Sequence, residues 1–321
     1  MIVSSIKESV VNSACRDILA GRDSIVIDNE IERDPDIILF VFRQCLCKIP
    51  EVVNINVNRC AVSYGKTVCI KTRPHVGWNK FKNCRCTFTM EDSKRLSGYA
   101  NKVAAELSLA SKNEMNKVIA IYEYLTDTVE YEDSDNAHTA WGALIDRKAV
   151  CEGISFAFCL LAKKCGLEAT IVDGLLNGGD HAWNIVKVDG VLYHVDATDG
   201  VSRKERGARC YDGLFLKDSD MIGYVWDKKN YPPCNADRLN YFIASKSFAD
   251  SEAQAIEIIS RQLLKHKVVY FRCSNRMNAD KESVFRMFQE ACERTNTRCK
   301  STVLYSNLKI KSFQIIYEGS K

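Results

Sequence analysis

Residues 149–198 hold a cysteine, a histidine and an aspartate in the order and setting that thiol catalysis needs. Cys151 stands at the expected N-terminus of a helix, and His181 and Asp196 lie on two consecutive expected strands. A helix N-terminus lowers the pKa of a cysteine because free amides and the helix dipole favour negative charge. An imidazole can take up the thiol proton, and a carboxylate can orient that imidazole. The pattern therefore predicts a nucleophilic thiol served by a general base.

A tight turn between the two strands fixes how the histidine and the aspartate lie relative to each other. Asp189 and Gly190 are typical of a two-residue hairpin loop. Counting back from that loop places His181 diagonally from Asp196 on the same face of the sheet. Such diagonal neighbours lie ~7–8 Å apart, which allows a carboxylate–imidazole hydrogen bond. A slip of one residue would put the two side chains on opposite faces.

Other residues of these types have a simpler explanation as parts of the core. Cys159 and Cys165 fall deeper in the apolar helix expected over residues 151–165, where burial keeps a thiol protonated and unreactive. His194 would share a sheet face with Asp196 but lies nearer the turn. We expect a structural role for it.

Three further side chains are candidates for the substrate cleft. His138 stands in a polar segment before the nucleophile helix and could line the cleft. Trp141 and Trp183 could flank a substrate channel, but each could equally well pack in the core.

Four short runs of residues carry a resemblance to a known family. They are Trp141-Gly-Ala-Leu, Ala149-Val-Cys151-Glu-Gly153, Gly179-Asp-His181-Ala-Trp183-Asn184 and Tyr193-His-Val-Asp196-Ala-Thr198. In this order and spacing they resemble bacterial transglutaminase-like domains, which belong to the papain-like thiol enzymes, over roughly residues 110–240. The resemblance implies Cys151 as nucleophile, His181 as base and acid, and Asp196 as orienting group. It also implies a papain-like α+β core, with the nucleophile helix packed on an antiparallel sheet.

The elements around these motifs divide the chain into three expected parts. These are an N-terminal α/β module (1–90), a transglutaminase-like catalytic domain (91–243) and a C-terminal α/β module (244–321). Helices are expected over 5–20, from Asp34-Pro35 to just before Pro50, and over 91–129 (two), 151–165, 251–265 and 280–293. Strands are expected near 24–28, 52–57, 60–64, 67–72, 84–90, 168–173, 181–188, 191–197, 267–272, 299–305 and 308–317. A capping box formed by Ser111 and Glu114 predicts the start of the second central helix. The terminal modules are either copies of one α-β-α-β-β unit or alike by chance.

Composition excludes several classes of protein. The 321 residues are 46% hydrophobic and 27% charged, as in a soluble globular chain of two or three domains. The 45 basic and 41 acidic residues are too balanced for a nucleic-acid-binding face. The apolar run from Ile37 to Phe42 is far too short to span a bilayer, and the first residues carry no secretory signal. We therefore expect no nucleic-acid or membrane partner and a cytoplasmic location.

The cysteines indicate free thiols and no metal. There are 15 of them, an odd number, with no Cys-x-x-Cys pair. The Cys-x-Cys pairs Cys45/Cys47 and Cys84/Cys86 lack the spacing of a zinc site. A reducing compartment explains such a set, and neither a metal nor an organic cofactor is implied.

Taken together, the motifs predict acyl transfer through a thioester at Cys151, acting on peptide or side-chain amides of a peptide or protein substrate. Family members often carry a tryptophan after Asp-x-Thr, where this chain has Asp199 and Gly200. The polar stretch 198–213 should admit water, which favours a cysteine peptidase or amide hydrolase. The alternatives are a protein-glutamine amine acyltransferase, a catalytically silent peptide-binding module, or a scaffold built on the terminal modules. The oligomeric state is left open.

Overall fold

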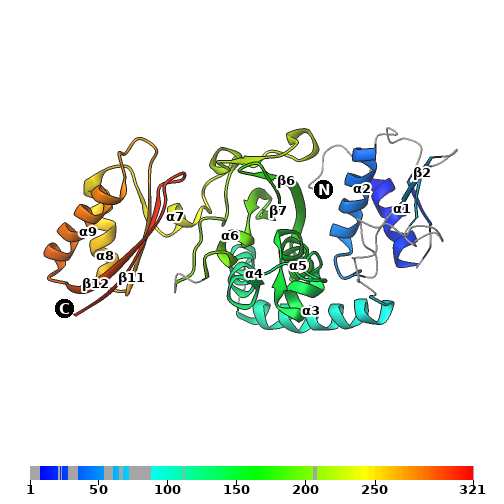
Figure 1. The fold of residues 1–321 in the computed structure, drawn as a ribbon, viewed down its shortest axis with the longest axis horizontal. Coiled ribbons are helices and arrows are strands. Elements are labelled where there is room, and N and C mark those ends of the chain that lie inside the picture. The colour runs from blue at the N-terminus through cyan, green and yellow to red at the C-terminus, as the bar shows by residue number, and fades with distance from the viewer. Residues whose placement is uncertain are drawn as a thin grey trace.

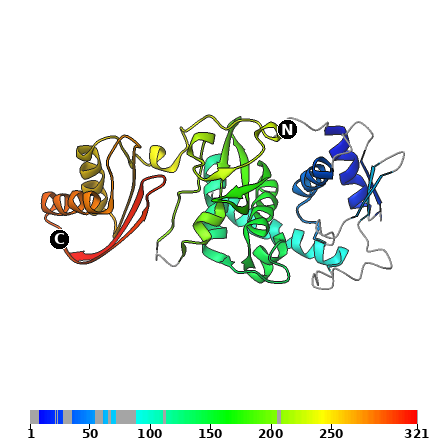
Figure 2. The ribbon, with the colours of Figure 1, turned by 45° about the horizontal axis from the view of Figure 1, so that its top comes forward.

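The computed structural model describes residues 8–20, 22, 24–27, 35–53, 61–64, 68–71, 88–110, 113–204 and 208–320. Their helices and strands form three parts that lie in a row, with the chain passing from one end of the row to the other (Figure 1). The same order is visible after rotation (Figure 2). The expected α+β class is confirmed, whereas the boundaries of the three domains stay a prediction.

The central part is built around a buried helix packed on an antiparallel sheet. Its helices are α3 (Met90–Ala110), α4 (Glu114–Thr128), α5 (Cys151–Lys164) and α6 (Ala197–Val201), and its strands are β4 (Glu130–Tyr131), β5 (Lys148–Ala149), β6 (Glu168–Leu176), β7 (Gly179–Val188), β8 (Val191–Val195) and β9 (Tyr224–Val225). The larger sheet has the order β8-β7-β6-β9. Helix α5 packs against β6 and β7 and is enclosed by α3 and α4. Residues 153–162 of α5 are all buried, as an apolar helix surface on every side predicts.

The β7–β8 hairpin has the register that its turn predicts. Asp189 and Gly190 both have positive φ angles, 49° and 79°, as a type I′ turn requires. Val188 pairs with Val191, and the ladder continues to Asn184. The even-numbered residues of β7 therefore face α5, while the odd-numbered residues face the opposite side of the sheet.

The two terminal parts share one order of elements, helix–strand–helix–strand–strand. The N-terminal elements are α1 (Glu8–Leu19), β1 (Ser24–Ile27), α2 (Pro35–Lys48), β2 (Ala61–Tyr64) and β3 (Val68–Lys71), and the C-terminal ones are α8 (Glu252–Leu263), β11 (Val268–Cys273), α9 (Lys281–Thr295), β12 (Arg298–Asn307) and β13 (Ser312–Ser320). The last strand lies in the middle in both, giving β1-β3-β2 and β11-β13-β12. The C-terminal sheet adds β10 (Phe248–Ala249) beside β11. This common topology agrees with a repeat, whose common origin stays a prediction.

The two terminal parts are attached to the centre in different ways. Apolar side chains of α2, among them Phe42, belong to one continuous core with Leu160 of α5 and Ile171 of β6. The C-terminal part has a core of its own, built from α8, α9, β11 and β13. Its helices cover one face of its sheet (Figure 1).

Hydrogen bonds to one buried carboxylate join the C-terminal part to the centre. Asp212 accepts from the hydroxyls of Tyr270 (2.6 Å) and Ser312 (2.8 Å) and from the amide of Asn307 (3.2 Å). Arg203 of the central part also pairs with this carboxylate. Beside these polar contacts, an aromatic cluster around Phe242 of the connecting helix α7 (Tyr241–Ala244) packs Tyr211 of the centre near Tyr270 of β11.

Some expectations about the first 115 residues need correction. No strand runs through residues 88–90, because α3 begins at Met90, and residues 84–87 lie outside the described residues. Likewise 51–53 are not in a strand, and the rest of the strand expected near 52–57 is not described. Ser111 is also outside the described residues. Helix α4 begins at Glu114, and its N-cap is Asn113, whose side chain accepts from the amide of Asn116.

No helix among the described residues is long and apolar enough to cross a membrane. The cytoplasmic location stays a prediction.

Candidate active site

Three side chains that are far apart in sequence meet at the end of the central sheet. Cys151 is the first residue of α5, His181 lies on β7, and Asp196 follows β8. The imidazole Nε2 of His181 is 2.8 Å from Oδ2 of Asp196. The imidazole also interacts with the thiol of Cys151. The structure thus brings all three residues together, on the hairpin face that the register predicts.

Asp196 is held by contacts on both of its oxygens. Oδ1 accepts from the backbone amide of Thr198 (3.0 Å) and caps α6, while Oδ2 accepts from the hydroxyl of Tyr224 (2.7 Å) as well as bonding His181. Its own amide donates to the carbonyl of Gly213 (2.8 Å). The carboxylate is 1% exposed, so it has little freedom to leave His181.

The pKa shifts favour a thiolate–imidazolium pair. Burial opposes a charge on His181, but hydrogen bonds to Asp196 and Cys151 outweigh it and raise its pKa to about 10. Burial likewise raises the pKa of Cys151, yet the bond to His181 and the backbone amide of Ala182 bring it below the usual thiol value. For Asp196, burial is outweighed by the bonds to His181 and Tyr224, so its pKa is lowered. Each of the three pKa shifts favours the charged form of its group: the thiolate, the imidazolium and the carboxylate.

Tyr131 lies against the helix end that carries the thiol. Val150, the N-cap of α5, offers no capping side chain. The hydroxyl of Tyr131, on β4, accepts from the amide of Cys151 and also contacts its thiol. The Tyr131 side chain is 50% exposed, so this position faces solvent. Sequence reasoning missed Tyr131, because β4 lies 20 residues before the nucleophile and has no motif of its own.

Gly153 allows the chain before α5 to pack directly on the helix. A Cβ at this position would lie 2.1 Å from the carbonyl oxygen of Ala137 and 2.9 Å from that of Thr139. We expect Gly153→Ala to lower the free energy of unfolding by about 1–3 kcal/mol through overpacking, and to slow alkylation of Cys151. Urea unfolding of the full chain measures the first effect.

Gly98 provides the matched control. It lies on α3 with nothing within 4 Å of an added Cβ, so Gly98→Ala should stabilise the helix by roughly 0.5–1 kcal/mol. A Gly153→Ala protein as stable as the wild type would contradict the close packing at α5.

A row of charged groups extends from the nucleophile to the N-terminal part. Glu152 bonds Nδ1 of His138 (2.9 Å) with one oxygen and Nη2 of Arg43 (3.0 Å) with the other. Arg43, on α2, also reaches Asp173 of β6 (2.5 Å). The hydrogen bond to Glu152 raises the pKa of His138. His138, half exposed and next to this row, is the one predicted cleft residue that lies at the surface.

The two predicted cleft tryptophans are buried. Trp141 packs against Phe88, with ring centroids 5.2 Å apart, and donates to Asp146 (3.1 Å). Trp183 is fully buried behind His181, with ring centroids 6.0 Å apart and planes at 20°. Neither indole is exposed enough to contact a substrate in this structure.

The described residues of the stretch 198–213 do not form the open polar loop that its composition predicts. Residues 197–201 form α6, and Arg203 pairs with Asp199 (2.7 Å). The aromatic rings at this side of the site come instead from Tyr224 and Trp226, which contact Trp183. The described part of the stretch is thus folded, although Val201, Ser202 and Lys204 still line a hollow at the surface.

Two groups of side chains in the described part have donor atoms close enough to share a metal ion. One consists of Asp199, Cys210 and Asp212. Arg203 pairs with both of its carboxylates, so the positive charge that a cation would bring is already present. The other, His194 with Asp218 and Cys234, lies on the same sheet face as His181, on the far side of Trp183.

Comparisons with known proteins point to one superfamily for the centre of the chain. Residues 101–197, which include Cys151, His181 and Asp196, match the transglutaminase-like superfamily. The chain therefore contains a transglutaminase-like domain. No curated protein sequence matches the chain.

Several solved structures are similar to part of the chain. A TGase is 18% identical, with 55% of this chain and 50% of that chain covered and a TM-score of 0.31. A candidate cysteine protease from Cytophaga hutchinsonii is 18% identical, with 44% and 55% covered and a TM-score of 0.30. The periplasmic domain of TgpA from Pseudomonas aeruginosa is 20% identical, with 34% and 45% covered and a TM-score of 0.27. The match spans about half the length of each of these chains.

Proposed function

We propose that the transglutaminase-like domain is a cysteine-dependent amide hydrolase in which Cys151, His181 and Asp196 act as nucleophile, general acid–base and orienting group. The observation that carries the proposal is the continuous contact from thiol to imidazole to buried carboxylate. A catalytically silent binding module has no need of such an arrangement. A peptide or a side-chain amide of a protein is the substrate class that this chemistry fits.

The reaction follows from the charges at the site. The thiolate of Cys151 attacks the amide carbon, and His181 then donates its proton to the departing nitrogen as the C–N bond breaks. The product of this step is a thioester on Cys151. Water attacks the thioester, His181 takes up the water proton, and the carboxylic acid leaves with the thiolate restored.

Amide groups near Cys151 are placed to stabilise the tetrahedral intermediate. The amide of Cys151 faces the hydroxyl of Tyr131, and the amide of Ala182 points to the thiol. Donors fixed in advance around a developing oxyanion lower the barrier because they need no reorganisation. The carbonyl oxygen of the substrate would lie near these two amides, in place of the Tyr131 hydroxyl or beside it.

Access of water at Tyr131 supports hydrolysis over transfer to an amine. Tyr131 contacts the reacting thiol and is half exposed. A hollow of about 640 Å³ adjoins it, lined by polar groups such as Glu130 and Lys204. Water is present at ~55 M, so a thioester in an open site hydrolyses unless a specific wall excludes water.

Partition between water and an amine tests this proposal. With a mixed peptide library and millimolar methylamine, we expect mass spectrometry to find mainly carboxylic acid products and few methylamides. Cys151→Ala, the matched control, should form neither product. A majority of methylamide products would make the protein an amine acyltransferase and overturn the hydrolase proposal.

A further inference from the structure

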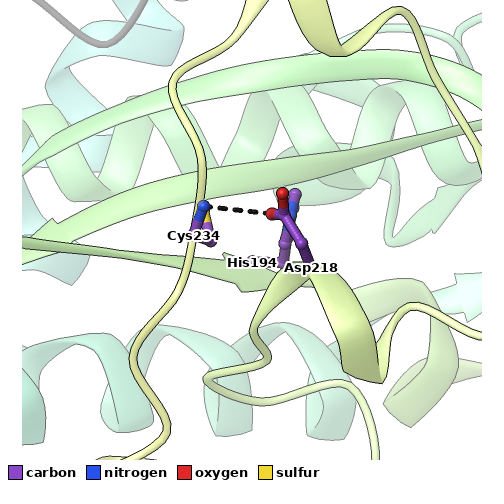
Figure 3. A group of neighbouring side chains, drawn as sticks. All are labelled: His194, Asp218 and Cys234. Carbon is purple, nitrogen blue, oxygen red and sulfur yellow. Dashed lines mark hydrogen bonds and ion pairs between the residues drawn. The ribbon is translucent and has the colours of Figure 1, made fainter.

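A second histidine–aspartate pair lies behind the candidate site, on the sheet face away from α5. In the described part, the donor atoms of His194, Asp218 and Cys234 lie within 4.8 Å of one another, and His194 and Cys234 are buried (Figure 3). Nε2 of His194 is 2.9 Å from Oδ1 of Asp218. The same oxygen accepts from the backbone amide of Cys234 (3.0 Å). The residues come from β8 and from the irregular chain that covers this face.

The indole of Trp183 decides which nitrogen of His194 carries the proton. Its Nε1–H donates to Nδ1 of His194 over 3.0 Å. An indole nitrogen can only donate, so Nδ1 must offer a lone pair and the ring proton must be on Nε2. That proton is then donated to Asp218. A metal ion on Nε2 would displace this proton to Nδ1, where it would oppose the indole N–H. The geometry is thus that of a hydrogen-bonded chain and not of a metal site.

This chain of hydrogen bonds ends on the ring that supports His181. Trp183 and His181 are alternate residues of β7 on one face, and their planes are nearly parallel at 20°. On the β6 side, Gly174 leaves room for the indole, since a Cβ there would lie 2.9 Å from its Cη2 atom. The indole is fully buried, so its N–H depends on His194 for a partner. Losing that partner would free the ring to turn in search of another.

We propose that His194 and Asp218 are positioning residues: through the chain Asp218–His194–Trp183 they fix the plane of the indole, which holds the imidazole of His181 between Cys151 and Asp196. This inference rests on the proposed function, because it concerns the same imidazole. It assigns no contact with substrate to either residue. The thiol of Cys234 takes no part, since only its backbone amide is used.

The groups around the imidazole of His181 determine which measurement can detect a change in its position. Asp196 bonds it, Cys151 lies on its other side, and Tyr224 packs on its edge and bonds Asp196. Tyr131 faces the thiol. A tilted imidazole would weaken the thiolate–imidazolium pair among these unchanged groups. The rate of Cys151 alkylation, followed across the acidic to alkaline range, therefore reports on the position of His181.

Two matched pairs of variants in the full chain test the proposal with iodoacetamide. Asp218→Ala and His194→Leu should lower the alkylation rate of Cys151 at neutral pH by about tenfold or more and move its pH profile toward that of an ordinary thiol. Asp218→Asn keeps a side-chain oxygen that can accept from both the His194 ring and the backbone amide of Cys234. His194→Gln offers an acceptor to the indole and a donor to Asp218. Both should keep the wild-type rate and profile, as should Cys234→Ser.

Each contrary outcome overturns a defined claim. A wild-type rate and profile in Asp218→Ala would overturn the positioning role alone. Equimolar zinc in the wild type that is lost in Cys234→Ser would overturn it in favour of a metal site. A wild type without a fast-reacting Cys151 would overturn this inference together with the proposed function. If His194→Leu fails to fold, the Asp218 pair decides, because this carboxylate is 22% exposed at the edge of the cluster.

Discussion

In the Cys151→Ala variant, rapid alkylation of the protein by limiting iodoacetamide should disappear, and peptide hydrolysis with it. The expectation follows from the lowered pKa of this thiol, which is bonded to His181 and sits at a helix end without a capping side chain. The thiolate is the reactive form, so a lowered pKa gives fast labelling at neutral pH. Mass spectrometry of digested protein locates the label, and the variant should show almost none.

Cys159→Ala is the matched control, on the same helix. Burial raises the pKa of Cys159 well above the ordinary value, and this side chain is 2% exposed. Its removal should leave the labelling unchanged. A label found mainly on another cysteine would show that Cys151 is not the activated thiol.

The pH dependence of the wild type has a predictable sign. The thiolate–imidazolium pair exists above the lowered pKa of Cys151 and below the pKa of His181, about 10. Alkylation should therefore stay fast below ~8.5, where ordinary thiols are protonated. Hydrolysis should fall as pH rises through about 10, because His181 then has no proton for the leaving group.

Asp196→Asn should give the second large loss, with the fold retained. If the amide keeps its oxygen on Thr198, its NH2 group faces both the ring of His181 and the hydroxyl of Tyr224, which are donors to the native carboxylate. The ring would then shift to the tautomer that presents a proton to the thiol. In a serine protease the corresponding change costs ~10⁴ in turnover, and we expect a loss of about 10²–10⁴ in kcat here.

Tyr224→Phe provides a graded comparison for that variant. It removes one donor from Asp196 and leaves the bond to His181, so its loss in kcat should be much smaller. Circular dichroism checks that both variants fold. Unchanged kcat in Asp196→Asn would mean that another group orients His181.

The contact between His181 and Asp196 was predictable because it depends on local chemistry. A two-residue loop at Asp189 and Gly190 dictates the pairing of the strands that flank it. The alternation of side chains along each strand then puts both residues on one face of the sheet. The helix beginning at Cys151 was also predictable, because its unbroken apolar surface can be recognised in the local sequence.

The other contacts at the site depend on tertiary packing that leaves no local pattern. Tyr224 reaches Asp196 only because a two-residue strand, β9, pairs with β6 after a long irregular connection. Arg43 arrives from a helix more than 100 residues before its partners Glu152 and Asp173. The start of α4 was misplaced because Asn113 and Ser111 are both good N-cap residues two positions apart, and sequence alone does not rank them.

The different attachment of the two terminal parts bears on how the folded chain comes apart. A shared apolar core couples neighbouring elements into one all-or-none transition, whereas a hydrogen-bonded contact can exchange its partners for water. The N-terminal part, whose α2 shares the central core, should therefore melt with the nucleophile helix. The C-terminal part has its own core and contacts the centre through Asp212 and the aromatic cluster around Phe242, so we expect it to unfold as a separate unit. We therefore expect two cooperative unfolding units, with the two parts of like topology in different ones.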